Sequence, residues 1–208
     1  NIKQTKMRRF LLSVCALMSL SVMAQDDVKM IKSGMSTTLD NGLVKAVIGS
    51  DGRIKTMTYK GGSSNLMGSN GIYFDYTADK NRALSPSKAE IVKRTPEMCE
   101  VLYTNTTDDL QFQQGFIMRK GVSGLYVYVI ANGTPTSSTV KLKETRVCVR
   151  LASTFLNGYV DDLMNGKIPS NSEMVTAEKS ENTVQDATYR MADGSIYTKY
   201  NWGNYCVR

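Results

Sequence analysis

The middle of the chain is a succession of short segments rich in β-branched and aromatic residues, each ended by Gly, Asn, Asp or Pro. Such runs are typical of β-strands. Before residue 150 no apolar stripe has both the period and the length of a helix. We therefore predict an all-β fold, an antiparallel β-sandwich. The predicted strands cover residues 43–48, 54–59, 71–76, 89–94, 99–104, 110–119, 125–130 and 140–151.

The last third of the chain is poorer in strand signals. Residues 173–183 are compatible with one or two helical turns. The Asp193-Gly194 turn signal then precedes a strand-like alternation that carries Tyr197, Lys199, Tyr200 and Trp202. Aromatic rings beside cations suit an anionic sugar, because sugar C–H faces pack on rings and cations pair with carboxylates. The same pattern is also typical of ordinary core and surface positions in a strand.

Residues 1–24 are predicted to be upstream residues and a secretory signal peptide, not part of the fold. From Met7 a basic start is followed by an apolar run and by the small residue Ala24, so cleavage is expected between Ala24 and Gln25. The apolar run is shorter than the roughly 20 residues that a membrane span needs. We expect export to the periplasm, the cell surface or the medium, with no stable membrane insertion after cleavage.

The leader also accounts for most of the chain's positive charge. The whole chain has 26 basic and 19 acidic residues, and residues 1–24 hold four of the basic residues and no acid. The predicted mature part, residues 25–208, therefore has 22 basic residues against 19 acidic ones, a net charge of +3. This weak charge does not support nucleic-acid binding, but it is compatible with an acidic polysaccharide.

The residue inventory limits the chemistry. No histidine is present, which excludes the Ser-His-Asp triad and most zinc sites within these residues. No pair of cysteines has Cys-x-x-Cys spacing, and no calcium-binding loop occurs. We expect neither a metal nor a cofactor. Cys99, Cys148 and Cys206 would remain after leader cleavage, either as one disulfide and a free thiol or as buried free cysteines.

Several segments, in order, resemble the N-terminal catalytic domain of rhamnogalacturonan lyases (polysaccharide lyase family 4), especially forms from gut Bacteroidetes. The similarity spans about residues 37–208. It is carried by Asn41-Gly-Leu-Val-Lys45, Phe116-Ile-Met-Arg-Lys-Gly-Val-Ser-Gly-Leu-Tyr-Val-Tyr128, Glu144-Thr-Arg146, Asn165-Gly-Lys-Ile-Pro169 and Tyr197-Thr-Lys-Tyr-Asn-Trp202.

The resemblance implies a large β-sandwich of the galactose-mutarotase-like type, incomplete at the C-terminus of this chain. In the family a fibronectin-like and a jelly-roll domain follow. The resemblance also implies a histidine shortly after Tyr200, acting together with a lysine, which these residues do not include. We therefore expect weak or no lyase activity from residues 25–208 alone.

The implied reaction is β-elimination next to galacturonate in rhamnogalacturonan, a pectin. It needs a base for the C5 proton and a cation on the neighbouring carboxylate. By resemblance Lys167 is the predicted base and Arg119 the predicted carboxylate ligand, while Tyr200 and Trp202 are predicted to hold the sugar. The alternative for each of the two cations is an exposed residue of a turn.

Two other functions agree with the same residues. One is a non-catalytic carbohydrate-binding β-sandwich of a larger exported protein. The other is a sandwich that packs against further domains. For the lyase we expect an acidic plant polysaccharide and the downstream domains of the full-length protein as partners. Arg146 and Arg150 share a strand face, as in surface ladders, and rank below Arg119 as ligands.

Overall fold

The computed structural model describes residues 26–106, 110–133, 141–159, 162, 165–167, 169–185 and 188–198. The chain clusters into two compact units, a first unit of residues 1–150 and a second of residues 151–208. Strands predominate among the described residues, which include the helix α2 (Asn171–Lys179). This confirms the predicted all-β class.

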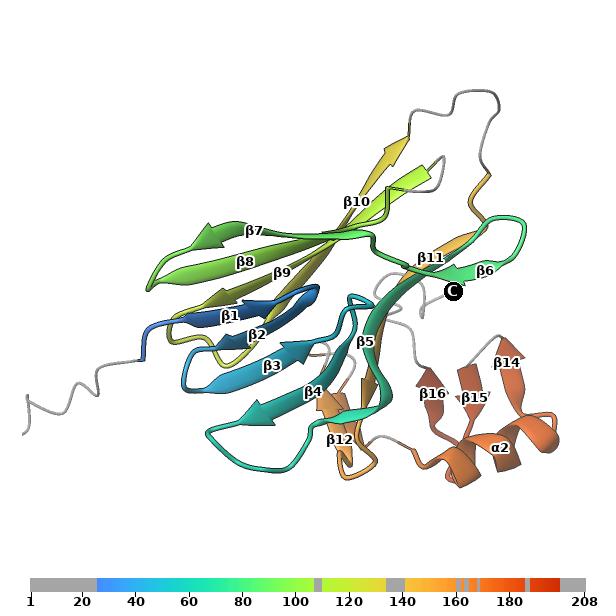
Figure 1. Cartoon of the computed structure of the whole chain (residues 1–208). Helices are drawn as coiled ribbons and strands as arrows, with labels where there is room; N and C mark the ends of the chain where they lie inside the picture. The colour runs from blue at the N-terminus through green and yellow to red at the C-terminus, as the bar shows by residue number, and fades with distance from the viewer. Residues whose placement is uncertain are drawn as a thin grey trace, which may run out of the picture. The chain divides into compact units, whose positions relative to one another are not determined.

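The first unit holds two antiparallel sheets, seen in Figure 1. Sheet A has the order β1-β2-β3-β4-β5-β11, with β6 paired to β5, and sheet B has the order β10-β9-β8-β7. The strands are β1 (Lys29–Ser33), β2 (Ser36–Asp40), β3 (Val44–Ile48), β4 (Ile54–Tyr59), β5 (Met67–Thr77), β6 (Asn81–Ala83), β7 (Lys88–Arg94), β8 (Met98–Thr104), β9 (Leu110–Arg119), β10 (Tyr126–Gly133) and β11 (Glu144–Leu151).

Alternation along the strands places one face of each sheet in a shared core. In β9, Phe112, Phe116 and Met118 are buried, and they alternate with residues that face outward. Aromatic rings join the two sheets, because the Phe112 ring of β9 lies 4.9 Å from Phe74 and 4.5 Å from Tyr76 of β5, centroid to centroid. Such tilted contacts suit the ring quadrupoles. The two sheets therefore form the predicted sandwich.

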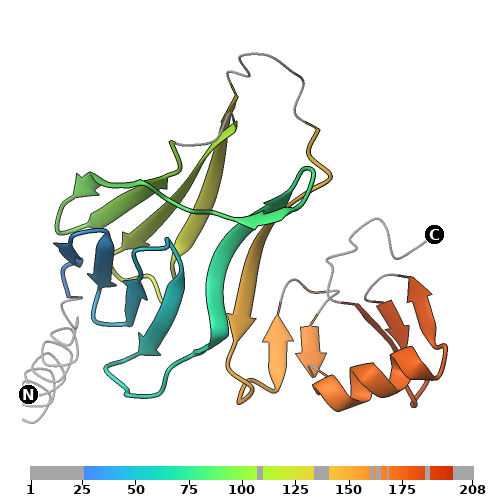
Figure 2. The same cartoon turned by 45° about the vertical axis from the view of Figure 1, so that its right-hand side comes forward.

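The second unit contains a short hairpin and a small sheet. β12 (Asn157–Tyr159) pairs with β13 (Asn165–Lys167), and β14 (Thr183–Gln185), β15 (Thr188–Arg190) and β16 (Ile196–Thr198) form a three-stranded sheet. Figure 2 shows α2 lying along this sheet. Ala177 of α2 and Thr188 of β15 are both buried, which is consistent with packing between the two elements.

Most predicted strands are observed within a few residues of their predicted limits, but three details differ. The hairpin β1–β2 was not predicted before residue 39. The predicted turn-like segment around Lys167 is a strand, β13. The helix begins at Asn171 rather than at Glu173, because Ser170 caps it: Ser170 Oγ accepts from Glu173 N, and the Glu173 carboxylate accepts from Ser170 N.

Two sequence-based questions concern export and thiols. Among the described residues, no helix combines the length and apolar character needed to cross a membrane. The predicted leader lies outside the described residues. Cys99 is a buried free thiol and Cys148 is a half-buried free thiol, whereas Cys206 lies outside the described residues.

Candidate active site

Arg119, the predicted carboxylate ligand, is the last residue of β9 and is exposed. Asn41 fixes the turn that follows it. The buried Asn41 side chain donates from Nδ2 to the carbonyl oxygens of Arg119 (2.7 Å) and Val122 (2.8 Å). Its Oδ1 accepts from the backbone N–H groups of Leu43 and Val44. Both donors and both lone pairs of this amide are thus used, and they lock the turn after Arg119 onto the turn between β2 and β3.

The side chain of Arg119 differs from that of its neighbour Lys120. Lys120 Nζ lies 2.7 Å from Asp27 and 3.6 Å from Glu97. The hydrogen bond to Asp27, more than any other interaction, raises the pKa of Lys120. In the described part of the chain, the guanidinium of Arg119 makes neither an ion pair nor a hydrogen bond. Arg119 is therefore a cation available to an external carboxylate, which its planar fork fits.

Arg146 has a different role. Its Nε and Nη2 bind the two carboxylate oxygens of Asp75 at 2.8 and 2.7 Å. Asp75 belongs to β5 and its side chain is only 6% exposed, so this bidentate pair neutralises a buried charge and ties β11 to β5. The hydrogen bond to Asp75 is the main cause of the raised pKa of Arg146. Because its guanidinium is occupied, Arg146 is a structural residue here, in line with its lower rank from sequence.

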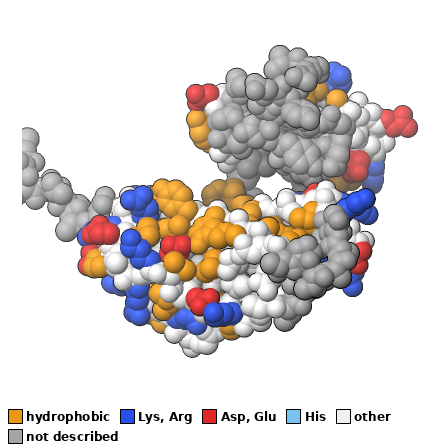
Figure 3. Space-filling model, turned by 90° about the horizontal axis from the view of Figure 1, so that it is seen from above, with side chains coloured by type: hydrophobic (Ala, Val, Ile, Leu, Met, Phe, Trp, Pro, Cys, Tyr) orange, Lys and Arg blue, Asp and Glu red, His pale blue; other side chains and the backbone are white. Residues whose placement is uncertain are grey.

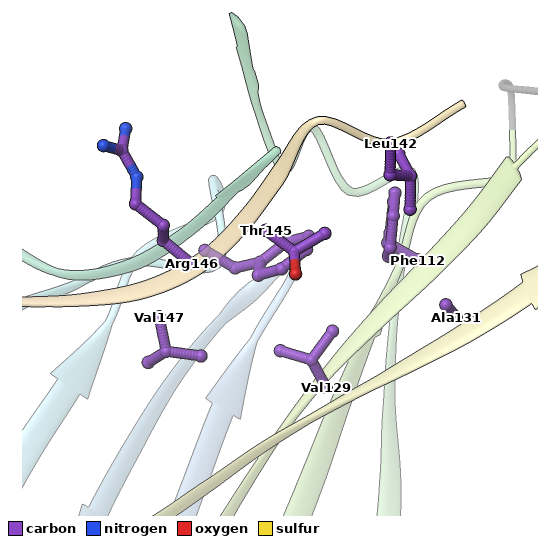
Figure 4. A pocket seen from close by; sticks show the side chains of 8 residues that line it. Phe112, Val129, Ala131, Leu142, Thr145, Arg146 and Val147 are labelled. Atoms are coloured by element: carbon purple, nitrogen blue, oxygen red, sulfur yellow. The ribbon is translucent and has the colours of Figure 1, made fainter. Parts of the chain in front are cut away.

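A cavity of about 340 Å³ lies beside Arg146, between β5 and β11 on one side and β9 and β10 on the other. Figure 4 shows that the guanidinium of Arg146 points away from Phe112, Val129 and Leu142. This cavity offers few polar groups and suits apolar groups better than an acidic sugar. Its lining residues are Phe74, Phe112, Val129, Ala131, Leu142, Thr145, Arg146 and Val147.

Lys167, the predicted base, ends β13 in the second unit. Its side chain is 72% exposed, and Nζ lies 3.0 Å from Oε1 of Glu173. Glu173 is held by the cap of α2. The backbone N–H of Ser170, its hydroxyl and then Lys167 lower the pKa of Glu173 to about 2. A base needs a free lone pair on a neutral amine, whereas Nζ of Lys167 is engaged by the Glu173 carboxylate in this arrangement.

Of the four predicted site residues, the structure describes two. Arg119 and Lys167 are both described, each in its own unit. Tyr200 and Trp202 lie outside the described residues.

The Asp193-Gly194 turn forms as predicted, since the carboxylate of Asp193 accepts from the backbone of Ser195 at 2.9 Å. In the ranges that the structure covers, no group of three or more His, Cys, Asp or Glu side chains could hold a metal.

The sequence analysis did not single out Asn41 or the tyrosines of β10 as site residues. Asn41 sits in an Asp-Asn-Gly turn signal, but a contact across 78 residues leaves no local pattern. Tyr126 and Tyr128 alternate in β10 and share its outward face, a signal that could have been used. Figure 3 shows hydrophobic side chains gathered on one face of the first unit, with both basic and acidic side chains around them.

Comparison with known proteins gives two results. Residues 16–192 match the model of the rhamnogalacturonate lyase family. A curated protein described as a rhamnogalacturonate lyase, from Dickeya dadantii (strain 3937), is 34% identical over 197 residues, which are 89% of this chain. The chain spans about a third (33%) of the length of that relative. On these two matches, the chain belongs to the rhamnogalacturonate lyase family.

Proposed function

We propose that the protein containing this chain is an exported polysaccharide lyase that cleaves rhamnogalacturonan by β-elimination next to galacturonate. The proposal is supported by family membership and by the name of the Dickeya relative. The observation that carries it in this chain is Arg119, an exposed guanidinium without an acidic partner among the described residues, at the end of a strand whose following turn is held by Asn41.

In the proposed reaction Arg119 pairs with the carboxylate of galacturonate, and this pairing stabilises the negative charge that develops when C5 loses its proton. Lys167, as the neutral amine, takes the C5 proton. A C4–C5 double bond forms as the C4–O4 bond breaks, and the leaving oxygen takes a proton from an acid or from water. The products are an unsaturated galacturonate end and a new hydroxyl on the neighbouring rhamnose.

Glu173 has a place in this scheme. It holds Lys167 when no substrate is bound, and it is itself held by Ser170. Because Glu173 keeps its hydrogen bonds to the helix cap, it stays ionised after Lys167 leaves. Lys167 can therefore leave Glu173 to act at C5 of the substrate, and the Glu173 charge that stays behind is not buried, because this side chain is 43% exposed.

The test is to incubate the complete gene product with rhamnogalacturonan and to follow ultraviolet absorbance and product masses. A lyase gives an absorbing product whose mass contains no added water. A hydrolase gives products that have gained water, and a binding module gives none, so either result would contradict the proposal. Isolation of a mature form that begins at or near Gln25 would test the predicted export.

A further inference from the structure

The outer face of sheet B carries two tyrosines in a fixed arrangement. In the register of β9 and β10, Tyr126 lies opposite Ile117 and Tyr128 opposite Gly115. Their neighbour Phe116 is fully buried, so the alternation of the strand turns both tyrosines outward, away from the core. Tyr126 is 50% exposed.

The Tyr128 ring lies over Gly115 of β9. A Cβ on Gly115 would overlap the ring, so a side chain at that position would lift Tyr128 off the sheet. The hydroxyl reaches past β9 to β8, where it donates to Oε1 of Glu100 at 2.6 Å. Burial, and then this hydrogen bond, raise the pKa of Tyr128 to about 12. The ring is thus fixed against β9 on the outward face of the sheet, where the side chain is half-buried.

Arg119 lies at the end of the same face. It follows Ile117 by two residues on β9, so its side chain leaves the sheet on the side of Tyr126. As a diagonal neighbour in an antiparallel pair, its Cβ is expected about 7–8 Å from that of Tyr126. Neither the Arg119 guanidinium nor the Tyr126 hydroxyl has a partner among the described residues. An apolar ring and a free cation therefore leave the same face of sheet B at diagonal positions of two paired strands.

Polar groups border the rings at the other end of this face. Asn132 donates to Gln113 at 3.2 Å, and Gln113 in turn donates to Thr104 at 3.1 Å. A purely apolar protein partner would cover the free Arg119 charge without compensation, at a high desolvation cost. A chain that alternates apolar and acidic units would instead satisfy both the ring and the cation.

We propose that Tyr126 and Tyr128 form a platform for the rhamnose next to the galacturonate that Arg119 binds. Rhamnose is a deoxy sugar with a methyl group, so it offers more apolar surface to a ring than galacturonate does. This proposal rests on the proposed function, and it assigns to the platform the choice of rhamnogalacturonan over a polymer of galacturonate alone.

The test measures calorimetric affinity for a rhamnogalacturonan oligosaccharide and for an oligogalacturonate of equal length. The complete gene product is used in a Lys167→Ala background, with the ligands checked by mass spectrometry for cleavage. Tyr126→Ala should weaken binding of the rhamnogalacturonan oligosaccharide by about tenfold and leave oligogalacturonate binding nearly unchanged. Tyr126→Phe should bind both normally, because stacking does not need the hydroxyl. Tyr128→Ala should resemble Tyr126→Ala.

A matched control is Tyr73→Ala, which removes a half-buried tyrosine of β5 in sheet A whose ring contacts Arg53, and which should change neither affinity. Arg119→Ala should weaken both ligands. If Arg119→Ala weakens both but Tyr126→Ala weakens neither, the platform is wrong and the proposed function stands. If Tyr126→Ala weakens rhamnogalacturonan binding and Arg119→Ala does not, the platform stands and the role of Arg119 fails. If Tyr126→Ala changes only self-association, the face is a protein interface, which overturns the platform.

Discussion

The Nδ2 group of Asn41 holds the carbonyl oxygen of Arg119 at 2.7 Å, across 78 residues of sequence. A second bond from the same nitrogen to Val122 makes Asn41 a clamp on the turn between β9 and β10. A buried asparagine thus positions the backbone of the residue that we assign to the substrate carboxylate.

Asn41→Ala should lower the free energy of unfolding by about 2–4 kcal/mol, because it leaves several buried backbone groups without partners. It should also weaken binding of galacturonate oligosaccharides, since the turn after Arg119 loses its anchor. Urea unfolding and calorimetry measure the two effects.

Asn65→Ala is the matched control for this clamp. Asn65 also bonds three backbone groups, those of Lys55, Met57 and Met67, but it is exposed and distant in sequence from Arg119. A smaller loss of stability with normal binding is expected. If both asparagine variants had the same effect on binding, Asn41 would have no special link to Arg119.

Arg146→Ala should lower the free energy of unfolding by about 2–3 kcal/mol, because Asp75 would be left charged and buried. The effect should stay below that of a fully buried pair, since the Arg146 side chain is 39% exposed. Arg150→Ala, on the same strand and without an ion pair among the described residues, should change stability by less than about 0.5 kcal/mol. Adding Asp75→Asn to Arg146→Ala should recover part of the loss; no recovery would mean that the pair is not the cause.

In a spectrophotometric titration Tyr128 should ionise near pH 12, well above the ordinary tyrosine value of 10.0. Its pKa in the folded state is raised above the unfolded value of 10.0, so its contribution to stability is complete below pH 10 and is lost as the pH rises towards 12. Glu100→Gln removes the charge next to the hydroxyl and should lower this pKa. An unchanged titration in Glu100→Gln would leave burial as the only cause.

Glu173 should cause a loss of stability at low pH, as Tyr128 does at high pH. Its pKa falls from 4.5 to about 2 in the folded protein, so its stabilising effect is present above pH 4.5 and is lost as the pH drops through about 2. Loss of α2 in that range should be visible by chemical shifts of residues 171–179. In Glu173→Gln the same acid step should be absent; a step that persists would have to come from another carboxylate.

The strands of sheet B were predictable because they are local patterns. The alternation of buried Phe112, Phe116 and Met118 with outward residues is a two-residue period that any single strand shows. The hairpin β1–β2 lacks such a clear period, since Lys29 and Lys32 interrupt its apolar residues. The hairpin is instead joined to the core by contacts between distant segments: the Tyr103 hydroxyl of β8 donates to the carbonyl of Met35 at 2.8 Å.

The site was predictable only in part, for the same reason. Lys167 and Glu173 are six residues apart, and the capping-box pattern of Ser170 and Glu173 is readable from the sequence. That Arg119 lacks an acidic partner among the described residues could not be predicted from the sequence. It depends on tertiary contacts in which Asp27 and Glu97 pair with Lys120 instead. Which cation is left for substrate is decided by tertiary contacts.

The most direct test of the central claim compares two variants of the complete gene product on rhamnogalacturonan, with formation of the unsaturated product followed by ultraviolet absorbance. Lys167→Ala should nearly abolish turnover and leave substrate affinity little changed, because a base acts in the transition state. Arg119→Ala should reduce both turnover and affinity, because its partner carboxylate is charged in both states. Near-normal turnover in Lys167→Ala, or unchanged affinity and turnover in Arg119→Ala, would contradict the account.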